Sequence, residues 1–141
     1  MKDLMKRMFA ARENAPKITY KQYQHAFEAH HVWKTRLINV IQRHTHLEEL
    51  HPDAWECHQG CQLGQWLRGD ETRHLAEHPE FLKLLDTHEH FHHAAAKLLQ
   101  LAIEHRGREV LFQMSRYGEF EAASLDLTRC LHRLHHGRDH N

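Results

Sequence analysis

The chain has 141 residues, and its 19 Lys and Arg residues balance 19 Asp and Glu residues, so the formal net charge is zero. This balance lacks the basic surplus with which nucleic-acid-binding proteins neutralise phosphates, and no run approaches the ~18 apolar residues of a membrane span. The N-terminus lacks the apolar stretch of a signal peptide, and three cysteines do not suggest a disulfide framework. We therefore expect a cytoplasmic protein with one main domain, without nucleic acid or membrane insertion among its interactions.

The chain divides into a short arm and one longer domain. Residues 1–16 predict an amphipathic helical arm that ends at Pro16, and residues 17–141 predict a helical domain. The arm has the chemistry to dock on this chain, on a second copy or on a partner helix. Its apolar side consists of Leu4, Met5, Met8 and Phe9.

The first long helix is predicted from a capping box at Thr19–Gln22 and extends to about His44. The apolar periodicity fades between about His46 and Gly60, where Pro52 indicates a loop. A short helix is predicted from Cys61 to Arg68. The apolar stripe of the first long helix comprises Tyr23, Ala26, Phe27, His30, Trp33, Leu37, Val40 and Ile41.

Two further long helices are predicted, one from Pro79 to about His105 and one from about Glu109 to His135. The pattern predicts an all-α fold, an antiparallel four-helix bundle of three long helices plus the short helix that carries Cys61, with the N-terminal arm. The stripe of the penultimate helix is Phe81, Leu84, Leu85, His88, Phe91, His92, Ala95, Leu98, Leu99 and Ala102. That of the last helix is Val110, Met114, Tyr117, Phe120, Leu127, Leu131 and Leu134.

Histidine is the unusual residue, with 18 among 141. At this abundance about two His-x-x-x-His pairs are expected by chance. The chain has four, so the spacing alone carries no functional information, and helix face is the criterion that separates them. The pairs are His74/His78, His88/His92, His132/His136 and His136/His140.

Three histidines fall on predicted core stripes. His88 and His92 replace apolar residues on one face, and positions four apart on a helix lie one above the other. His30 lies on the stripe of the first long helix. A single buried imidazole is most simply satisfied by a carbonyl or hydroxyl group, but three of them beside a cysteine favour a metal.

The cysteine is Cys61, which we place in the first turn of the short helix, where its pKa is lowered and the thiolate binds metal. Gly64 allows this helix to approach its neighbours, and Trp33 and Trp66 are expected to pack around the site. Three nitrogens and one sulfur form a tetrahedral set typical of zinc, with no position left for a catalytic water. The predicted ligands are His30, Cys61, His88 and His92.

The same residues resemble the signature of the chemoreceptor zinc-binding (CZB) domain over about residues 18–135. The pattern is a histidine on the first helix, a Cys-x-Leu/Phe-Gly-x-Trp block and a His-x-x-x-His pair. In this chain the three parts are Ala29-His30-His31-Val32-Trp33, Cys61-Gln62-Leu63-Gly64-Gln65-Trp66 and His88-Glu89-His90-Phe91-His92.

The resemblance implies a four-helix bundle, often a homodimer, with one zinc per chain held by His30, Cys61, His88 and His92. Family members regulate chemoreceptor signalling modules or diguanylate cyclases, which make cyclic-di-GMP, in response to zinc or to oxidation of the thiolate. This chain departs from the pattern because it carries no output module, so we expect a partner in trans or a longer parent protein. It also has the additional Cys57 and a surplus of histidine.

Several alternatives remain open. Surface histidines could make the chain a zinc store or buffer. The simpler interpretation is that they are ordinary solvent-exposed residues that bind no metal. A hemerythrin-like di-iron bundle requires His-x-x-x-Glu and His-x-x-x-x-Asp motifs, and only the former spacing occurs, at His44/Glu48 and His105/Glu109. We expect no enzymatic activity, because a zinc-bound thiolate is a poor nucleophile. Cys57 is interpreted as a thiol without a functional role rather than as one that forms a disulfide with oxidised Cys61. Cys130 is interpreted as a small buried hydrophobic residue.

Overall fold

The computed structural model describes residues 17–43, 47, 51–56 and 61–136. These residues form helices and connections without a strand, which confirms the all-α prediction. The predicted arm at residues 1–16 lies outside the described residues. In chain order the elements are α2 (Tyr20–Arg43), α3 (Pro52–Glu56), α4 (Gln62–Leu67), the 3₁₀ helix η3 (Asp70–Leu75), α5 (Pro79–Ile103), α6 (Gly107–Met114) and α7 (Glu119–His136).

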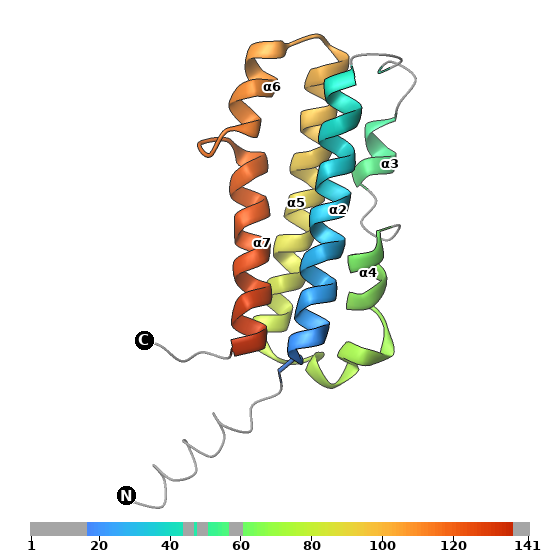
Figure 1. Cartoon of the computed structure of the whole chain (residues 1–141), viewed down its shortest axis with the longest axis vertical. Coiled ribbons are helices and arrows are strands. Elements are labelled where there is room, and N and C mark those ends of the chain that lie inside the picture. The colour runs from blue at the N-terminus through green and yellow to red at the C-terminus, as the bar shows by residue number, and fades with distance from the viewer. Residues whose placement is uncertain (1–16, 44–46, 48–50, 57–60, 137–141) are drawn as a thin grey trace, which may run out of the picture.

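The elements form a bundle with alternating chain direction (Figure 1). α2 and α5 run one way, whereas the segment from α3 to η3 and the segment from α6 to α7 run the other way. The segment from α3 to η3 therefore takes the place of one long helix, as the four-helix prediction required. α5 lies at the centre of the packing and contacts α2, α3, α6 and α7. Within the described residues, no helix has both the length and the apolar character needed to cross a bilayer.

The capping box at the start of α2 is present as predicted. The Thr19 amide donates to Gln22 Oε1 at 2.9 Å, and the Gln22 amide donates to Thr19 Oγ1 at 3.1 Å. The reciprocal bonds satisfy two backbone donors that a helix start otherwise leaves unpaired. The prediction that Phe27 belongs to the buried stripe of this helix is wrong, because its side chain is 43% exposed. The buried positions are Ala26, His30, Leu37 and Ile41, and Phe27 lies about 70° round the helix from the middle of this face.

α5 follows its predicted course closely. Pro79 occupies its first turn, and the ring of His78 accepts a hydrogen bond from the Glu80 amide at 3.2 Å. The helix ends where His105 adopts a positive φ of 60°, with its amide bonded to the Ala102 carbonyl. The buried face includes both His88 and His92 among Phe81, Leu84, Phe91, Ala95, Leu98, Leu99 and Ala102.

The prediction of one last helix is wrong, because a turn divides α6 from α7. Ser115 is extended, and a Cβ atom at Gly118 would overlap the Phe112 carbonyl oxygen and the backbone of Gln113. The Gln113 side chain then accepts hydrogen bonds from the first amides of α7. Tyr117 lies in this turn and is 70% exposed, so it is not a core residue as its periodicity suggested.

The predicted loop between His46 and Gly60 contains a short helix, α3. Pro52 begins it, and Asp53 in its first turn complements the positive end of the helix dipole. α3 packs against α5, and this contact brings the Trp55 carbonyl group to the candidate site.

Candidate metal centre

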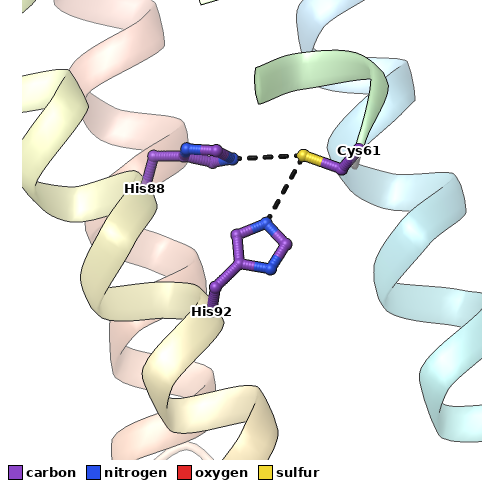
Figure 2. A group of neighbouring side chains, drawn as sticks. All are labelled: Cys61, His88 and His92. Carbon is purple, nitrogen blue, oxygen red and sulfur yellow. Dashed lines mark hydrogen bonds between the residues drawn. The ribbon is translucent and has the colours of Figure 1, made fainter. Parts of the chain in front are cut away.

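Three ligand atoms from two parts of the chain converge inside the bundle. Cys61 Sγ lies 3.3 Å from His88 Nε2 and 3.4 Å from His92 Nε2 (Figure 2). The ligand atoms of all three residues lie within 4.8 Å of one another. Their side chains are buried, with exposed fractions of 7% for Cys61 and 2% for each histidine. The structure thus brings together three of the four predicted ligands.

The two histidines are aligned by the helix that carries them. His88 and His92 are one turn apart on α5, and their ring centroids lie 4.7 Å apart at an interplanar angle of 82°. Both Nε2 atoms face the sulfur that approaches from the start of α4 (Figure 2). The helix-face criterion therefore identified, among the His-x-x-x-His pairs, the one whose rings converge on Cys61.

The Cys61 sulfur also caps α4. Cys61 is the residue before the helix, in extended conformation, and its Sγ accepts a hydrogen bond from the Gly64 amide at 3.1 Å. Gly64 is buried and contributes its backbone N–H to the sulfur. The expected lowering of the thiol pKa is wrong for the metal-free protein. Burial raises the pKa of Cys61, and the amides of Gly64 and Leu63 oppose this only in part.

His92 is oriented by groups on its far side. Its Nδ1 lies 3.0 Å from the Trp55 carbonyl oxygen, to which a neutral ring donates, leaving the Nε2 lone pair directed at Cys61. The ring of Trp33 packs against His92, with centroids 4.4 Å apart at 71°, and also contacts Trp55. Trp33 therefore lies beside the site, as expected.

The donor set fits zinc. Zinc bonded to sulfur at about 2.3 Å and to nitrogen at about 2.0–2.1 Å, in tetrahedral geometry, places the two donor atoms roughly 3.6 Å apart. The observed sulfur–nitrogen separations of 3.3 and 3.4 Å are close to this value. One thiolate and two imidazoles leave one tetrahedral position for a further donor.

The structure does not place His30 in this group. His30 is buried, at 5% exposure, and its Nε2 lies 2.8 Å from Ser124 Oγ on α7. Burial lowers its pKa from 6.5 to about 3, with Lys34 and His92 adding to the effect. Its ring packs edge-on against Phe91, the neighbour of His92 in α5. A neutral buried imidazole thus lies near the site but is satisfied by a hydroxyl group, and its assignment as fourth ligand stays a prediction.

Trp66 anchors α4 to η3. Its indole N–H donates to Glu71 Oε2 in η3 at 2.8 Å. Thr72 strengthens this connection by donating its hydroxyl to the Leu67 carbonyl at 3.1 Å. These two hydrogen bonds attach α4 to η3, and they thereby help to hold Cys61, the residue that precedes α4, in position.

Cys130, His105 and Glu109 have roles apart from the candidate ligand cluster. Cys130 is fully buried in α7, in agreement with a packing role. His105 and Glu109 are exposed at the end of α5 and in α6, so the described part of the chain provides no inward-facing carboxylate motif there. Cys57, His44 and Glu48 lie outside the described residues.

Comparison with known families agrees with this geometry. Residues 30–99 match the model of the chemoreceptor zinc-binding domain, a span that begins at His30 and contains Cys61, His88 and His92. No curated protein and no solved structure matches the chain. With the ligand cluster in place, zinc is the ion that this centre binds. The chain therefore belongs to the chemoreceptor zinc-binding domain family.

Proposed function

We propose that this chain is a regulatory module whose zinc occupancy controls the packing of α4 and is read by a signalling protein. The observation that carries the proposal is the position of Cys61. α4 packs against α2 and η3, whereas its capping sulfur faces His88 and His92 on α5. One ion at this point would attach α4 to α5 in addition to its packing against α2 and η3.

We assign the fourth ligand position to His30. Its imidazole is buried on α2 and packs edge-on against Phe91, the residue before His92 on α5, with ring centroids 4.5 Å apart. The neutral form, which its lowered pKa maintains, is the form that binds metal. With His30 included, the ligands come from α2, α5 and the residue that precedes α4.

When bound, zinc supplies a cross-link and keeps the sulfur as a thiolate. In its absence Cys61 holds a proton, because burial raises the pKa of its thiol, and only hydrogen bonds connect it to α5. A peroxide would have a related effect by transferring one oxygen atom to the thiolate, giving a sulfenic acid and hydroxide. Either event would weaken the attachment of α4 and change the surface that it forms with α2.

We further propose a cytoplasmic homodimer that acts on a chemoreceptor or diguanylate cyclase in trans, without catalysis of its own. The family name supports a chemoreceptor-type output. Exposed apolar side chains on α6, Leu111 and Phe112, supply area for contact with another protein. A zinc store or buffer is the alternative, and it would bind several ions with comparable affinity rather than one ion far more tightly than the rest.

Native mass spectrometry of protein purified without added metal tests the site. We expect one zinc per chain in the wild type and its loss in Cys61→Ala, with Cys130→Ala as the control that removes a buried thiol elsewhere. Zinc retained in Cys61→Ala, or iron in place of zinc, would contradict the assignment. The same spectra report whether the chain is dimeric.

Hydrogen exchange tests the regulatory step separately. Removal of zinc should speed amide exchange in residues 61–75 more than in α7. If residues 61–75 are equally protected with and without zinc, the assignment of the zinc site still stands, but the proposed regulatory change in α4 packing is wrong.

A further inference from the structure

A second group of imidazoles lies in the last turns of α7 and shares no residue with the Cys61 centre. The rings of His132 and His136 have centroids 4.1 Å apart, at an interplanar angle of 37°. Both side chains are exposed. They are one turn apart on a single helix, so their nitrogens can reach one point in solvent next to the helix.

The helical setting distinguishes this pair from the His74/His78 pair. His74 lies in η3 and His78 caps the start of α5, so that pair does not share a helix face. Only His88/His92 and His132/His136 lie on one α-helix in the described part of the chain. The first of these pairs belongs to the centre already assigned.

Aromatic packing restrains the pair. The ring of Tyr23 on α2 lies edge-on to His132, with centroids 6.2 Å apart. Tyr23 also stacks on His135, at 5.2 Å and 10°, while His135 Nδ1 lies 3.5 Å from the Ile18 carbonyl oxygen. His135 is therefore used to pack α7 against α2 and is not counted as a ligand.

The electrostatic setting contains contributions of both signs. The C-terminal end of a helix carries partial negative charge and unpaired carbonyl groups, which favour a bound cation. Arg133, on the same turn, is directed towards α5, where its Nε lies 3.3 Å from Glu80 Oε2. Arg129 and Arg133 both line the same surface hollow as His132, and their positive charges oppose a cation there, that of Arg133 being offset in part by Glu80.

We propose that His132 and His136 form a second, weaker site for a divalent transition metal that prefers imidazole, such as zinc, copper or nickel. The two nitrogens supply two ligand positions and water fills the others. Without a thiolate, this site exchanges its ion with solvent more readily than the Cys61 centre. It is also insensitive to oxidants that modify cysteine.

Titration of the zinc-loaded protein with further Zn²⁺, followed by calorimetry and native mass spectrometry, tests the proposal. We expect a second, weaker equivalent in the wild type that is lost in His132→Gln/His136→Gln. Single substitution of either residue should weaken it by at least about tenfold. His25→Gln/His74→Gln, which removes two exposed histidines elsewhere, should retain it.

The Cys61→Ala variant separates this site from the first one, because it should lose the tight ion and keep the weak one. The second equivalent should also shift the imidazole NMR signals of His132 and His136 selectively. A second zinc that binds equally well to His132→Gln/His136→Gln overturns the proposal. The absence of a second zinc in the wild type up to about 1 mM free ion does so as well.

Discussion

His92 and Trp55 are joined by a contact of 3.0 Å between an imidazole nitrogen and a backbone carbonyl oxygen. The bond determines which ring nitrogen carries the proton, and so directs the other nitrogen to Cys61. A five-residue helix that holds no zinc ligand among its described side chains thereby sets the orientation of a ligand on α5.

The first prediction follows from this contact. Trp55→Ala removes the ring that packs on Trp33, so the carbonyl group loses its fixed position. We expect zinc affinity to fall by about 10- to 100-fold, the usual effect of losing a group that orients a metal ligand. Trp55→Phe, which keeps an aromatic ring, should restore most of the affinity in a competition titration against a chelator. Unchanged affinity in Trp55→Ala would show that His92 needs no such support.

The second prediction concerns the buried bond between His30 and Ser124. Ser124→Ala leaves a buried imidazole nitrogen without its hydroxyl partner, which costs about 1–3 kcal/mol. Urea unfolding of the metal-free protein should show this loss. Thr128→Ala is the control on the same helix, because that exposed hydroxyl bonds only the Leu125 carbonyl of its own turn, and we expect little change. Equal losses in the two variants would contradict the prediction.

The third prediction is a pH dependence of the metal-free protein. The pKa of His30 is about 3 in the folded state, lowered mainly by burial, and 6.5 is its ordinary value. Between these values the unfolded chain binds a proton that the folded chain does not. The stability is therefore fully present above pH 6.5 and falls by about 1.4 kcal/mol per pH unit as the pH decreases towards 3.

His30→Gln lacks this titration and is the comparison. Unfolding at pH 7, 6 and 5 should show a slope for the wild type that is steeper by about one proton than the slope for the variant. Parallel slopes would mean that His30 becomes protonated in the folded protein as easily as in the unfolded chain.

The fourth prediction concerns the turn between α6 and α7. A Cβ atom at Gly118 overlaps backbone atoms, so Gly118→Ala should cost about 1–3 kcal/mol in thermal or urea unfolding. A Cβ atom at Gly107 meets no atom within 4 Å, which makes Gly107→Ala the matched control. Similar stability of the two variants would show that the turn relaxes without cost.

Much of the centre was predictable because its chemistry is carried by side chains with regular spacing. His88 and His92 interrupt an apolar stripe at an interval of four, and this interruption is visible in a sequence. Thr19 and Gln22 are an equally local pattern. Each of these predictions needed only the geometry of one helix.

The parts that could not be predicted depend on packing between elements. The Trp55 carbonyl is a backbone group, and no residue pattern indicates where a carbonyl points. The turn at Gly118 depends on the close approach of its backbone to Phe112 and Gln113. The spacing of apolar residues along the chain gives no indication of such an approach. Ser124 had a detectable signal, since it is a polar residue at helical spacing between the buried Phe120 and Leu127. Its partner His30 was assigned to the metal alone.

The cap of α4 has a thermodynamic consequence. One sulfur atom accepts the Gly64 amide and faces the two imidazoles, so formation of a six-residue helix and binding of an ion depend on the same atom. A helix this short is not stable in isolation, and we therefore expect its folding equilibrium to be coupled to the concentration of free zinc. Above the dissociation constant, each tenfold rise in free zinc adds about 1.4 kcal/mol to the folded, bound form. The stability of the bound form thus grows with the logarithm of free zinc, although the occupied fraction itself changes mainly within about one decade on either side of the dissociation constant.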